Sequence, residues 1–419
     1  MFLSLENIGK IHKADIEIKG ITIIAGENNT GKSTVGKVLY SIFNSFYHIE
    51  EQIYQQKKDS IFNDLSMLQI SNGKNTKNYR PVINLVELII KNQGKYIKDT
   101  KKLMKDVEQF LYRDSDIHIN TEAMSFIFKH IVEILKIKNE DFFNKAMTNR
   151  FNAEFASQIN NIYTEKDGQI HLTIKDKTMD ITVTANNIKL NSTQKSLDTE
   201  AIYIDDPFVV DELPSMYLNN SDSLNDHRND LKHKLYIKKQ KQNMINEMVS
   251  VNKLNNIYEQ LNPICDGSLE NDNNEFGYRK AGAKQRLDVR NISTGLKTFV
   301  ILKTLLQKGW IETKGTIILD EPEIHLHPEW QLLFARLIVL LQKELDMHIL
   351  LNTHSPYFLN AIEVYSAKYN IADKCKYYLA YLDNDIASIK DVTDNTEMIY
   401  AKLAKPLQDL ENERYNNDR

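Results

Sequence analysis

The residues best suited to chemistry lie in two short groups that are far apart in the chain. The first is the loop 26–33, Gly-Glu-Asn-Asn-Thr-Gly-Lys-Ser, which follows the apolar run 21–25 and precedes a helical pattern. A G-x-x-x-x-G-K-[ST] pattern between a strand and a helix is that of a phosphate-binding loop. Its backbone N–H groups can wrap phosphate oxygens, and its lysine can reach the β and γ phosphates. We therefore expect this region to hold a nucleoside triphosphate through Gly26, Asn28, Asn29, Thr30, Gly31, Lys32, Ser33 and Thr34.

The second group ends an apolar strand with two carboxylates. Residues 316–319 are Thr-Ile-Ile-Leu, and Asp320, Glu321 and Pro322 follow them. Open α/β sheets place their chemistry at the carboxyl ends of strands. We expect Asp320 and the hydroxyl of Ser33 to hold Mg²⁺, and Glu321 to orient or deprotonate an attacking water. Alone, the two carboxylates could be a solvated turn. Beside the phosphate loop, they predict a site that binds a nucleoside triphosphate with Mg²⁺ and hydrolyses it, with Lys32 as a further catalytic group.

Two more groups have weaker local signals. Ser293, Thr294 and Gly295 open an apolar helix, for which Ser293 is a good N-cap. The same hydroxyl and the glycine N–H could instead bind an anion. In isolation, the capping role is the commoner one. His354 follows the strand 348–353, which is the next strand after the one that ends at Asp320. That position favours a role in the site over that of an ordinary surface histidine.

Composition narrows the class of protein. The chain has 419 residues, of which 42% are hydrophobic and 26% charged, and its net charge is −4. These values are typical of globular proteins. No stretch resembles the apolar segment of about 18 residues that spans a membrane, and the N-terminus does not resemble a secretion signal. Cys265 and Cys375 have no metal-type spacing and fit a reducing compartment. We therefore expect a cytoplasmic protein with no membrane partner.

The periodicity indicates an α/β fold with helical interruptions. Residues 169–174 and 179–184 alternate as an antiparallel pair of strands would, and residues 201–207 resemble a core strand ended by a turn. The phosphate loop and Asp320 are much further apart than a compact nucleotide fold needs. We therefore predict a discontinuous P-loop NTPase domain with a mixed β-sheet. It would comprise residues 1–45, 161–211 and 263–393, with helical insertions at 46–160 and 212–262 and a C-terminal helix or tail at 394–419.

The order of these motifs resembles that of ABC-type ATPase heads. The stretches 318–328 (I-L-D-E-P-E-I-H-L-H-P) and 351–356 (L-N-T-H-S-P) resemble the RecF/SMC-like branch, in particular OLD-family ATPases and the ATPase subunits of bacterial anti-phage systems. The resemblance implies a homodimer, or a higher oligomer, with two ATP molecules between the heads. Ser293 and Gly295 of one copy would contact the γ-phosphate held by the other. Glu321 would polarise the water and His354 would be the switch histidine.

The resemblance has gaps that bear on function. Thr294 stands where the family signature has its second glycine, which suggests slow or partner-dependent turnover. The segment Asp205-Asp206-Pro207 occupies roughly the place of the Gln loop, and residues 325–328 would line the dimer seam. The residues after His354 are too few for the nuclease domain of a full OLD protein. We therefore expect the chain to control a separate effector, a nuclease, in anti-phage defence.

The alternative is a DNA-repair or DNA-end-binding ATPase that acts without a dedicated effector. Its support is the basic sequence Lys232-His233-Lys234 and Lys238-Lys239-Gln240-Lys241, which could contact nucleic-acid phosphates or form a solvated helix face. A capping-box pattern at 394–397 also predicts an amphipathic C-terminal helix with Ile399, Leu403, Leu407 and Leu410. That helix could pack on the head or dock a partner.

Overall fold

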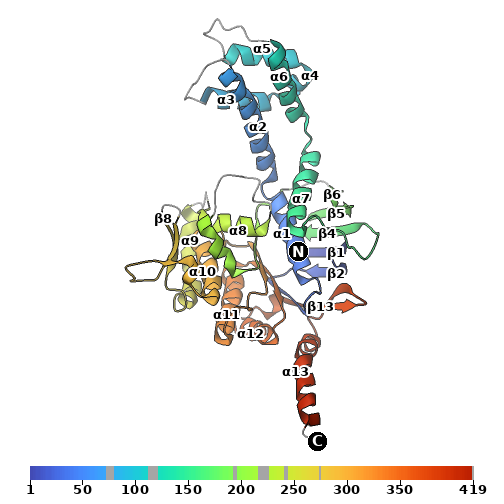
Figure 1. Cartoon of the computed structure of the whole chain (residues 1–419), viewed down its shortest axis with the longest axis vertical. Helices are drawn as coiled ribbons and strands as arrows, with labels where there is room; N and C mark the ends of the chain where they lie inside the picture. The colour runs from blue at the N-terminus through green and yellow to red at the C-terminus, as the bar shows by residue number, and fades with distance from the viewer. Residues whose placement is uncertain are drawn as a thin grey trace. The chain divides into compact units, whose positions relative to one another are not determined.

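The computed structural model describes residues 1–71, 80–111, 121–191, 196–215, 226–239, 244–272 and 275–417. The chain divides into two compact units (Figure 1). The first comprises residues 1–47 and 147–419, and the second comprises residues 48–146. The second unit lies inside the range 46–160 that the sequence suggests as a helical insertion, whereas residues 147–160 and 212–262 belong to the first unit.

A mixed β-sheet forms the centre of the first unit. In the described residues it has 11 strands, in the order β6-β5-β4-β1-β2-β14-β13-β3-β12-β11-β7. The predicted pair, β4 and β5, is antiparallel, whereas β13, β3, β12, β11 and β7 run parallel to one another. The strands are β1 Phe2–Ile8, β2 Ile11–Glu17, β3 Ile21–Gly26, β4 Gly168–Ile174, β5 Lys177–Thr184, β6 Asn187–Leu190, β7 Ala201–Ile204, β11 Thr316–Asp320, β12 His348–Thr353, β13 Cys375–Asp383 and β14 Ile386–Asp391.

Both faces of the parallel part of the sheet are covered, so most residues of its strands are apolar. In β11, Ile317 and Leu319 face one core, and Ile318 between them faces the other. This follows from the period of two along a strand. Helix α1 (Lys32–Phe46) packs on the Ile318 side, and α10 (Thr294–Gln307), α11 (Pro328–Leu345) and α12 (Pro356–Lys368) pack on the other. This arrangement is the predicted α/β fold with a mixed sheet.

Other elements of the first unit flank these layers. They are η1 Pro207–Ser215, α8 His227–Tyr236, α9 Met244–Leu261, η3 Val289–Asn291, η4 Ala372–Lys374, α13 Glu397–Asn417 and a small sheet of β8 Ser268–Asp272, β9 Glu275–Arg279 and β10 Leu287–Asp288. Helix α13 begins inside the predicted capping box. Its first turns bury Ile399 and pack Leu403 on the core, whereas Leu407 and Leu410 are each 62% exposed.

The second unit is helical and has a hydrophobic core of its own. Its helices are α2 Ile49–Ser71, α3 Arg80–Lys91, α4 Gln93–Lys98, α5 Thr100–Leu111, α6 Thr121–Lys136 and the beginning of α7 Asn139–Phe155. Leu85, Tyr96, Leu103 and Ile131 are among its buried residues. Across the described parts of both units, no helix has both the length and the apolar character needed to cross a membrane.

Candidate nucleotide-binding site

The strand order brings the separated motifs to one edge of the sheet. Strand β12 lies between β3 and β11 and is parallel to both. Its last residues are paired across the sheet, Thr353 with Ala25 of β3 and Asn352 with Asp320 of β11. The phosphate loop, the carboxylates and His354 therefore leave the sheet side by side at the carboxyl ends of three neighbouring strands, where open α/β sheets bind ligands.

The loop after β3 has the backbone geometry of a phosphate cradle. Gly31 has φ 81°, and a Cβ placed there would lie 2.9 Å from Ile11 Cγ1, so this position requires glycine. No side chain caps the start of α1. The first N–H groups of that helix are therefore oriented toward the loop and suited to bind anionic oxygens. Lys32 is 4% exposed, and its Nζ donates to the carbonyl oxygens of Gly26 at 3.1 Å and Glu27 at 2.9 Å.

The other predicted loop residues divide by exposure. Asn28, Asn29 and Ser33 are exposed, so their polar groups are accessible to a ligand. Thr30 is buried and its hydroxyl donates to the Glu27 carbonyl at 2.8 Å, which tightens the loop. The Thr34 N–H donates to the Gly31 carbonyl at 3.1 Å in the first turn of α1.

Asp320 is held rigidly at the end of β11. It is 8% exposed, the Tyr203 hydroxyl donates to its Oδ2 at 2.7 Å, and Asn352 Nδ2 donates to its Oδ1 at 2.9 Å. Carboxylate and hydroxyl oxygens are the hard ligands that Mg²⁺ prefers, and an ionised carboxylate has lone pairs beyond the two used here. Asp320 and Ser33 therefore fit a Mg²⁺ ion that is held jointly with the phosphates of a nucleotide.

Glu321 brings the three predicted catalytic residues together. Its Oε1 lies 3.4 Å from Lys32 Nζ and 3.4 Å from His354 Nδ1. Its φ is 49°, which is uncommon for a residue with a side chain, and its N–H donates to the Asn352 carbonyl at 2.9 Å. Such strained backbone persists where the surroundings impose it, often at functional sites. The carboxylate is 24% exposed and His354 is 39% exposed, so both can reach a bound ligand.

A second carboxylate in the same turn was not singled out from the sequence. Glu323 is 2% exposed and is hydrogen bonded to the Thr353 hydroxyl. Burial raises its pKa above the ordinary value for a glutamate, and the Thr353 hydrogen bond opposes that shift only in part. The contact links the turn after β11 to the end of β12, directly before His354. In the sequence, the one sign of this contact is that Thr353 directly precedes His354.

Ser293 and Gly295 lie at the start of α10. Ser293 occupies the N-cap position, but its side chain makes no capping hydrogen bond and is exposed. A Cβ on Gly295 would lie 3.0 Å from the His325 carbonyl oxygen and 3.2 Å from Trp330, so the glycine permits close packing on the turn after β11. Within the described residues, no hydrogen bond or ion pair links Ser293 to the phosphate loop of its own copy. A contact with the nucleotide of a second copy remains a prediction.

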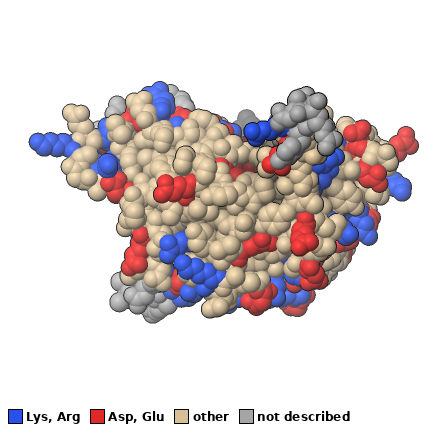
Figure 2. Space-filling model, turned by 90° about the horizontal axis from the view of Figure 1, so that it is seen from below, with Lys and Arg blue, Asp and Glu red and all other residues tan. Residues whose placement is uncertain are grey.

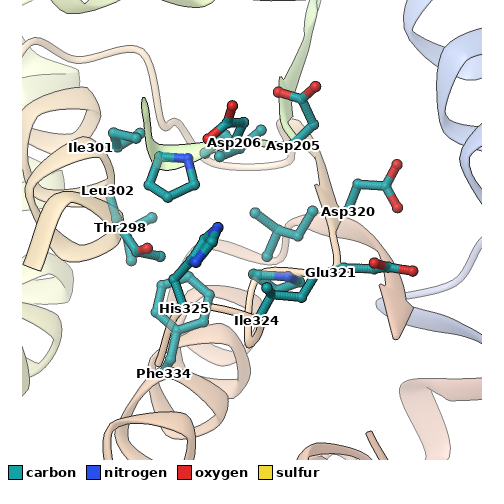
Figure 3. Close-up of a pocket in the computed structure, with 14 residues that line it drawn as sticks. Asp205, Asp206, Thr298, Ile301, Leu302, Asp320, Glu321, Ile324, His325 and Phe334 are labelled. Carbon is teal, nitrogen blue, oxygen red and sulfur yellow. The ribbon is translucent and has the colours of Figure 1, made fainter. Parts of the chain in front are cut away.

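A pocket of about 450 Å³ opens beside the carboxylates (Figure 3). Asp205 and Asp206 border it after β7, and Asp320 and Glu321 border it after β11. Its apolar walls come from α10, α11 and the turn after β11, namely Ile301, Leu302, Phe334 and Ile324. The segment Asp205-Asp206-Pro207, placed by sequence near the Gln loop, therefore lines the same recess as the predicted Mg²⁺ ligand.

In the described part of the basic run 232–241, Lys238 is exposed, but Lys232, Lys234 and Lys239 are paired with carboxylates. Lys234 is 3% exposed between Glu200 and Asp230, and Lys239 is 12% exposed between Glu200 and Glu312. Lys232 pairs with Glu212 at 3.0 Å. Gln240 and Lys241 lie outside the described residues. On the molecular face drawn in Figure 2, acidic and basic side chains are interspersed.

The fold and this edge of the sheet define a P-loop nucleotide-binding protein, and comparison with known proteins places it in a family. The model of the AAA ATPase domain matches residues 1–359. The chain belongs to this family, which confirms the ATPase fold predicted from the motifs.

The chain is also similar to solved heads of SMC proteins. The SMC head domain from Thermotoga maritima has 11% sequence identity and a TM-score of 0.38, over 93% of this chain and 98% of that one. An Smc head domain with an extended coiled coil, bound to the C-terminal domain of ScpA derived from Pyrococcus furiosus, has 11% identity and a TM-score of 0.42, over 98% of each chain.

Proposed function

We propose that this chain binds and hydrolyses ATP with Mg²⁺, that two copies close around two ATP molecules, and that this cycle controls a separate effector, a nuclease, in bacterial anti-phage defence. One observation carries the proposal of hydrolysis. Glu321, at the carboxyl end of β11, has the same carboxylate oxygen beside both Lys32 of the phosphate loop and His354. A carboxylate beside the phosphate-binding lysine is well placed to orient a water for attack.

Each group in the site has a defined task in this proposal. The N-terminal N–H groups of α1 and the Lys32 ammonium bind the phosphate oxygens and offset their charge. Ser33 and Asp320 would hold Mg²⁺, which neutralises charge on the β and γ oxygens when it is bound. Tyr203 and Asn352 fix the orientation of Asp320. Glu321 orients the water, and His354, next to Glu321, responds to the γ-phosphate.

Dimerisation is supported by side chains near the site that are exposed in a single copy. The Ser293 hydroxyl is exposed and caps nothing in its own helix, so it is available to a phosphate oxygen presented by a second copy. Ile324 is 52% exposed in the turn after β11, and Phe208 is 41% exposed and stacks edge-on against His325. Apolar side chains of this kind around a polar site suit burial by a second copy.

Control of an effector is supported by the C-terminal helix α13. Its first half is anchored, because Ile399 is buried and the Tyr400 hydroxyl donates to Glu363 at 2.5 Å. Its second half presents Leu407 and Leu410, three positions apart and each 62% exposed. A helix that is fixed at one end and presents two exposed leucines on its other, mostly polar half suits helix-in-groove binding to a partner.

The proposal is tested by purifying the chain alone and with the product of the neighbouring gene. We expect ATP binding and turnover by the chain, a stable complex, and nuclease activity that changes with ATP. Lys32→Ala should remove nucleotide binding, whereas Lys376→Ala, which alters a surface lysine paired with Glu17 at 3.0 Å, should leave it intact. Absence of a complex together with nuclease activity indifferent to ATP would refute the proposed control, and equal binding by both variants would refute the site.

A second candidate function, binding of DNA by the ATPase itself, is favoured by a different set of lysines in the helical unit. Six exposed lysines lie within 15 residues around α4 and α5: Lys91, Lys95, Lys98, Lys101, Lys102 and Lys105. Lys101, Lys102 and Lys105 lie three and four positions apart on one side of α5, whereas Leu103 and Val107 are buried; Lys98 is the last residue of α4. Such a stripe can follow a phosphate backbone.

The salt dependence of DNA binding tests this candidate. Each phosphate contact contributes about 0.9 to the slope of log K against log salt. Replacing Lys101, Lys102 and Lys105 by alanine should lower the slope by about 3 and weaken binding to any sequence. The matched control is Lys232→Ala, because Lys232 is already paired with Glu212. An unchanged slope in the triple variant would exclude this surface.

A further inference from the structure

A buried histidine outside the nucleotide motifs is held between two carboxylates. His227, the first residue of α8, has its Nδ1 2.7 Å from Glu154 Oε2 and its Nε2 3.0 Å from Asp205 Oδ2. The backbone N–H of His227 also donates to Glu154 Oε1 at 2.6 Å. The side chain of His227 is 11% exposed and that of Glu154 is fully buried. Nδ1 is therefore hydrogen bonded to Glu154 and Nε2 lies at ion-pair distance from Asp205, which holds the ring between the two carboxylates.

His227, Glu154 and Asp205 form one cluster, whose charge follows from its composition. Burial alone would lower the pKa of His227, but the hydrogen bonds to Asp205 and Glu154 outweigh it and raise the pKa to about 9. The imidazolium therefore persists at neutral pH and is the countercharge of a glutamate that has no contact with solvent. Removing either partner would leave a buried charge without compensation, which is costly.

The cluster reaches the predicted Mg²⁺ ligand by two routes. The Tyr203 ring stacks on the His227 ring, with centroids 4.3 Å apart and planes 23° apart, and the Tyr203 hydroxyl donates to Asp320 at 2.7 Å. The second route is Asp205 itself. Ile204 of β7 is paired with Leu319 of β11, so Asp205 and Asp320 are the next residues on adjacent parallel strands. Both border the pocket shown in Figure 3.

The other side of the cluster belongs to helix α7. Glu154 lies in the last turn of α7, the helix through which the chain passes from residues 48–146 back into the first unit. The same turn is tied to α1, because Lys37 Nζ donates to the Glu154 carbonyl at 3.0 Å. Glu154 does not line the pocket, and its side chain is linked to the residues around the pocket through His227.

We propose that His227 is a positioning residue that couples the last turn of α7 to the Mg²⁺-binding edge of the nucleotide site. Its ion pair holds the Asp205 carboxylate in position, and its ring stack holds the Tyr203 hydroxyl in position. These two groups define the surroundings of Asp320. The coupling is reciprocal, since a free energy that links two sites acts in both directions. Binding of Mg²⁺ and ATP therefore orders the end of α7, and a displacement of α7 weakens the binding of Mg²⁺. The inference rests on the proposed ATP site.

The dependence of the ATPase rate on Mg²⁺ concentration tests the inference. His227→Gln should raise the Mg²⁺ concentration for half-maximal rate by about 10-fold to 100-fold, as loss of outer-shell support of a metal ligand does. Its affinity for ATP without Mg²⁺ should change by less than about 2-fold, because His227 does not support the phosphate loop. The matched control is His171→Gln, another histidine paired with an aspartate, Asp180, on the outer strands β4 and β5. An unchanged Mg²⁺ requirement in His227→Gln would overturn the inference, whereas a wild-type chain that neither binds nor hydrolyses ATP would overturn the proposed function instead.

Two further variants test the inference, and the first of them does not depend on the folding of His227→Gln. Tyr203→Phe removes only the hydroxyl that donates to Asp320 and keeps the ring stack, and it should raise the Mg²⁺ requirement in the same way. Glu154→Gln acts on a residue outside the pocket. In a folded His227→Gln background it should have no further effect, because a residue that acts through another is non-additive with it.

Hydrogen exchange of the amides of residues 147–155 gives the reciprocal readout. Mg²⁺ and ATP should slow this exchange in the wild type but not in Tyr203→Phe. Equal protection in both proteins would contradict the coupling.

Discussion

Raising the pH should remove a defined amount of stability from the first unit through His227. The pKa of His227 is about 9 in the folded chain, whereas that of an unperturbed histidine is 6.5. A pKa raised by folding contributes stability that is fully present below pH 6.5 and is lost as the pH rises through 9. At 1.36 kcal/mol per pKa unit, the contribution is about 3 kcal/mol, an order-of-magnitude figure for a largely buried group.

The measurement needs a variant with the same shape and no titration at this position. The double variant Glu154→Gln/His227→Gln provides it, because two amides can replace the charged pair and neither titrates. A single His227→Gln variant is unsuitable here, since it would leave the buried Glu154 without its countercharge. Urea unfolding can be followed by tryptophan fluorescence, and both tryptophans, Trp310 and Trp330, belong to the first unit.

The expected result is a difference in unfolding free energy, wild type minus double variant, that falls by about 3 kcal/mol between pH 6 and pH 10. Other groups that titrate in this window, such as the N-terminus, are common to both proteins and cancel. A difference that stays constant across the window would refute the assignment of a buried imidazolium. A smaller fall that is complete near pH 7 would show that the folded pKa lies only slightly above the ordinary one.

Three further predictions follow from the site and the helices. Glu321→Gln should lower ATP turnover by about 10²-fold to 10⁴-fold and keep ATP binding, measured by single-turnover hydrolysis and by equilibrium binding; full turnover would remove the proposed water-orienting role. Gly31→Ala should destabilise the loop by about 1–3 kcal/mol and weaken ATP binding, because its φ is 81° and its Cβ would meet Ile11; wild-type affinity in a binding assay would count against the cradle. Leu407→Glu with Leu410→Glu should leave urea stability within about 0.5 kcal/mol of wild type and abolish co-purification of the effector; an intact complex would move the docking surface elsewhere.

The parts of the site that were predictable from sequence are those encoded by neighbouring residues. The phosphate loop is a contiguous pattern, and Asp320 and Glu321 follow an apolar strand directly. The antiparallel pair β4 and β5 was visible because its alternation is local. Each of these signals depends on residue types within a few positions, so no knowledge of the tertiary fold was needed.

The groups that support Asp320 were not predictable in the same way. Tyr203 and Asn352 come from β7 and β12, on either side of β11, so their contacts depend on the strand order. The ion pair of His227 with Glu154 joins residues from different helices for the same reason. The ion pairs that bury Lys234 and Lys239 of the basic run were not predictable either, because their partners Glu200 and Glu312 lie far away in the sequence.

The difference between residues in local motifs and residues whose contacts depend on the strand order has a functional consequence. Residues that would touch ATP, such as Lys32 and Glu321, lie in local motifs and can be recognised without the fold. Residues that would make the site responsive to the rest of the chain act across strands, since Asp320 is oriented by Tyr203 and Tyr203 is stacked on His227. A related chain could therefore keep both motifs and lose the link to α7 through changes at Glu154 and His227 alone. The expected phenotype is ATP turnover that persists but no longer responds to the last turn of α7, so uncoupled activity, rather than lost activity, is the signature that distinguishes this cluster from the nucleotide motifs.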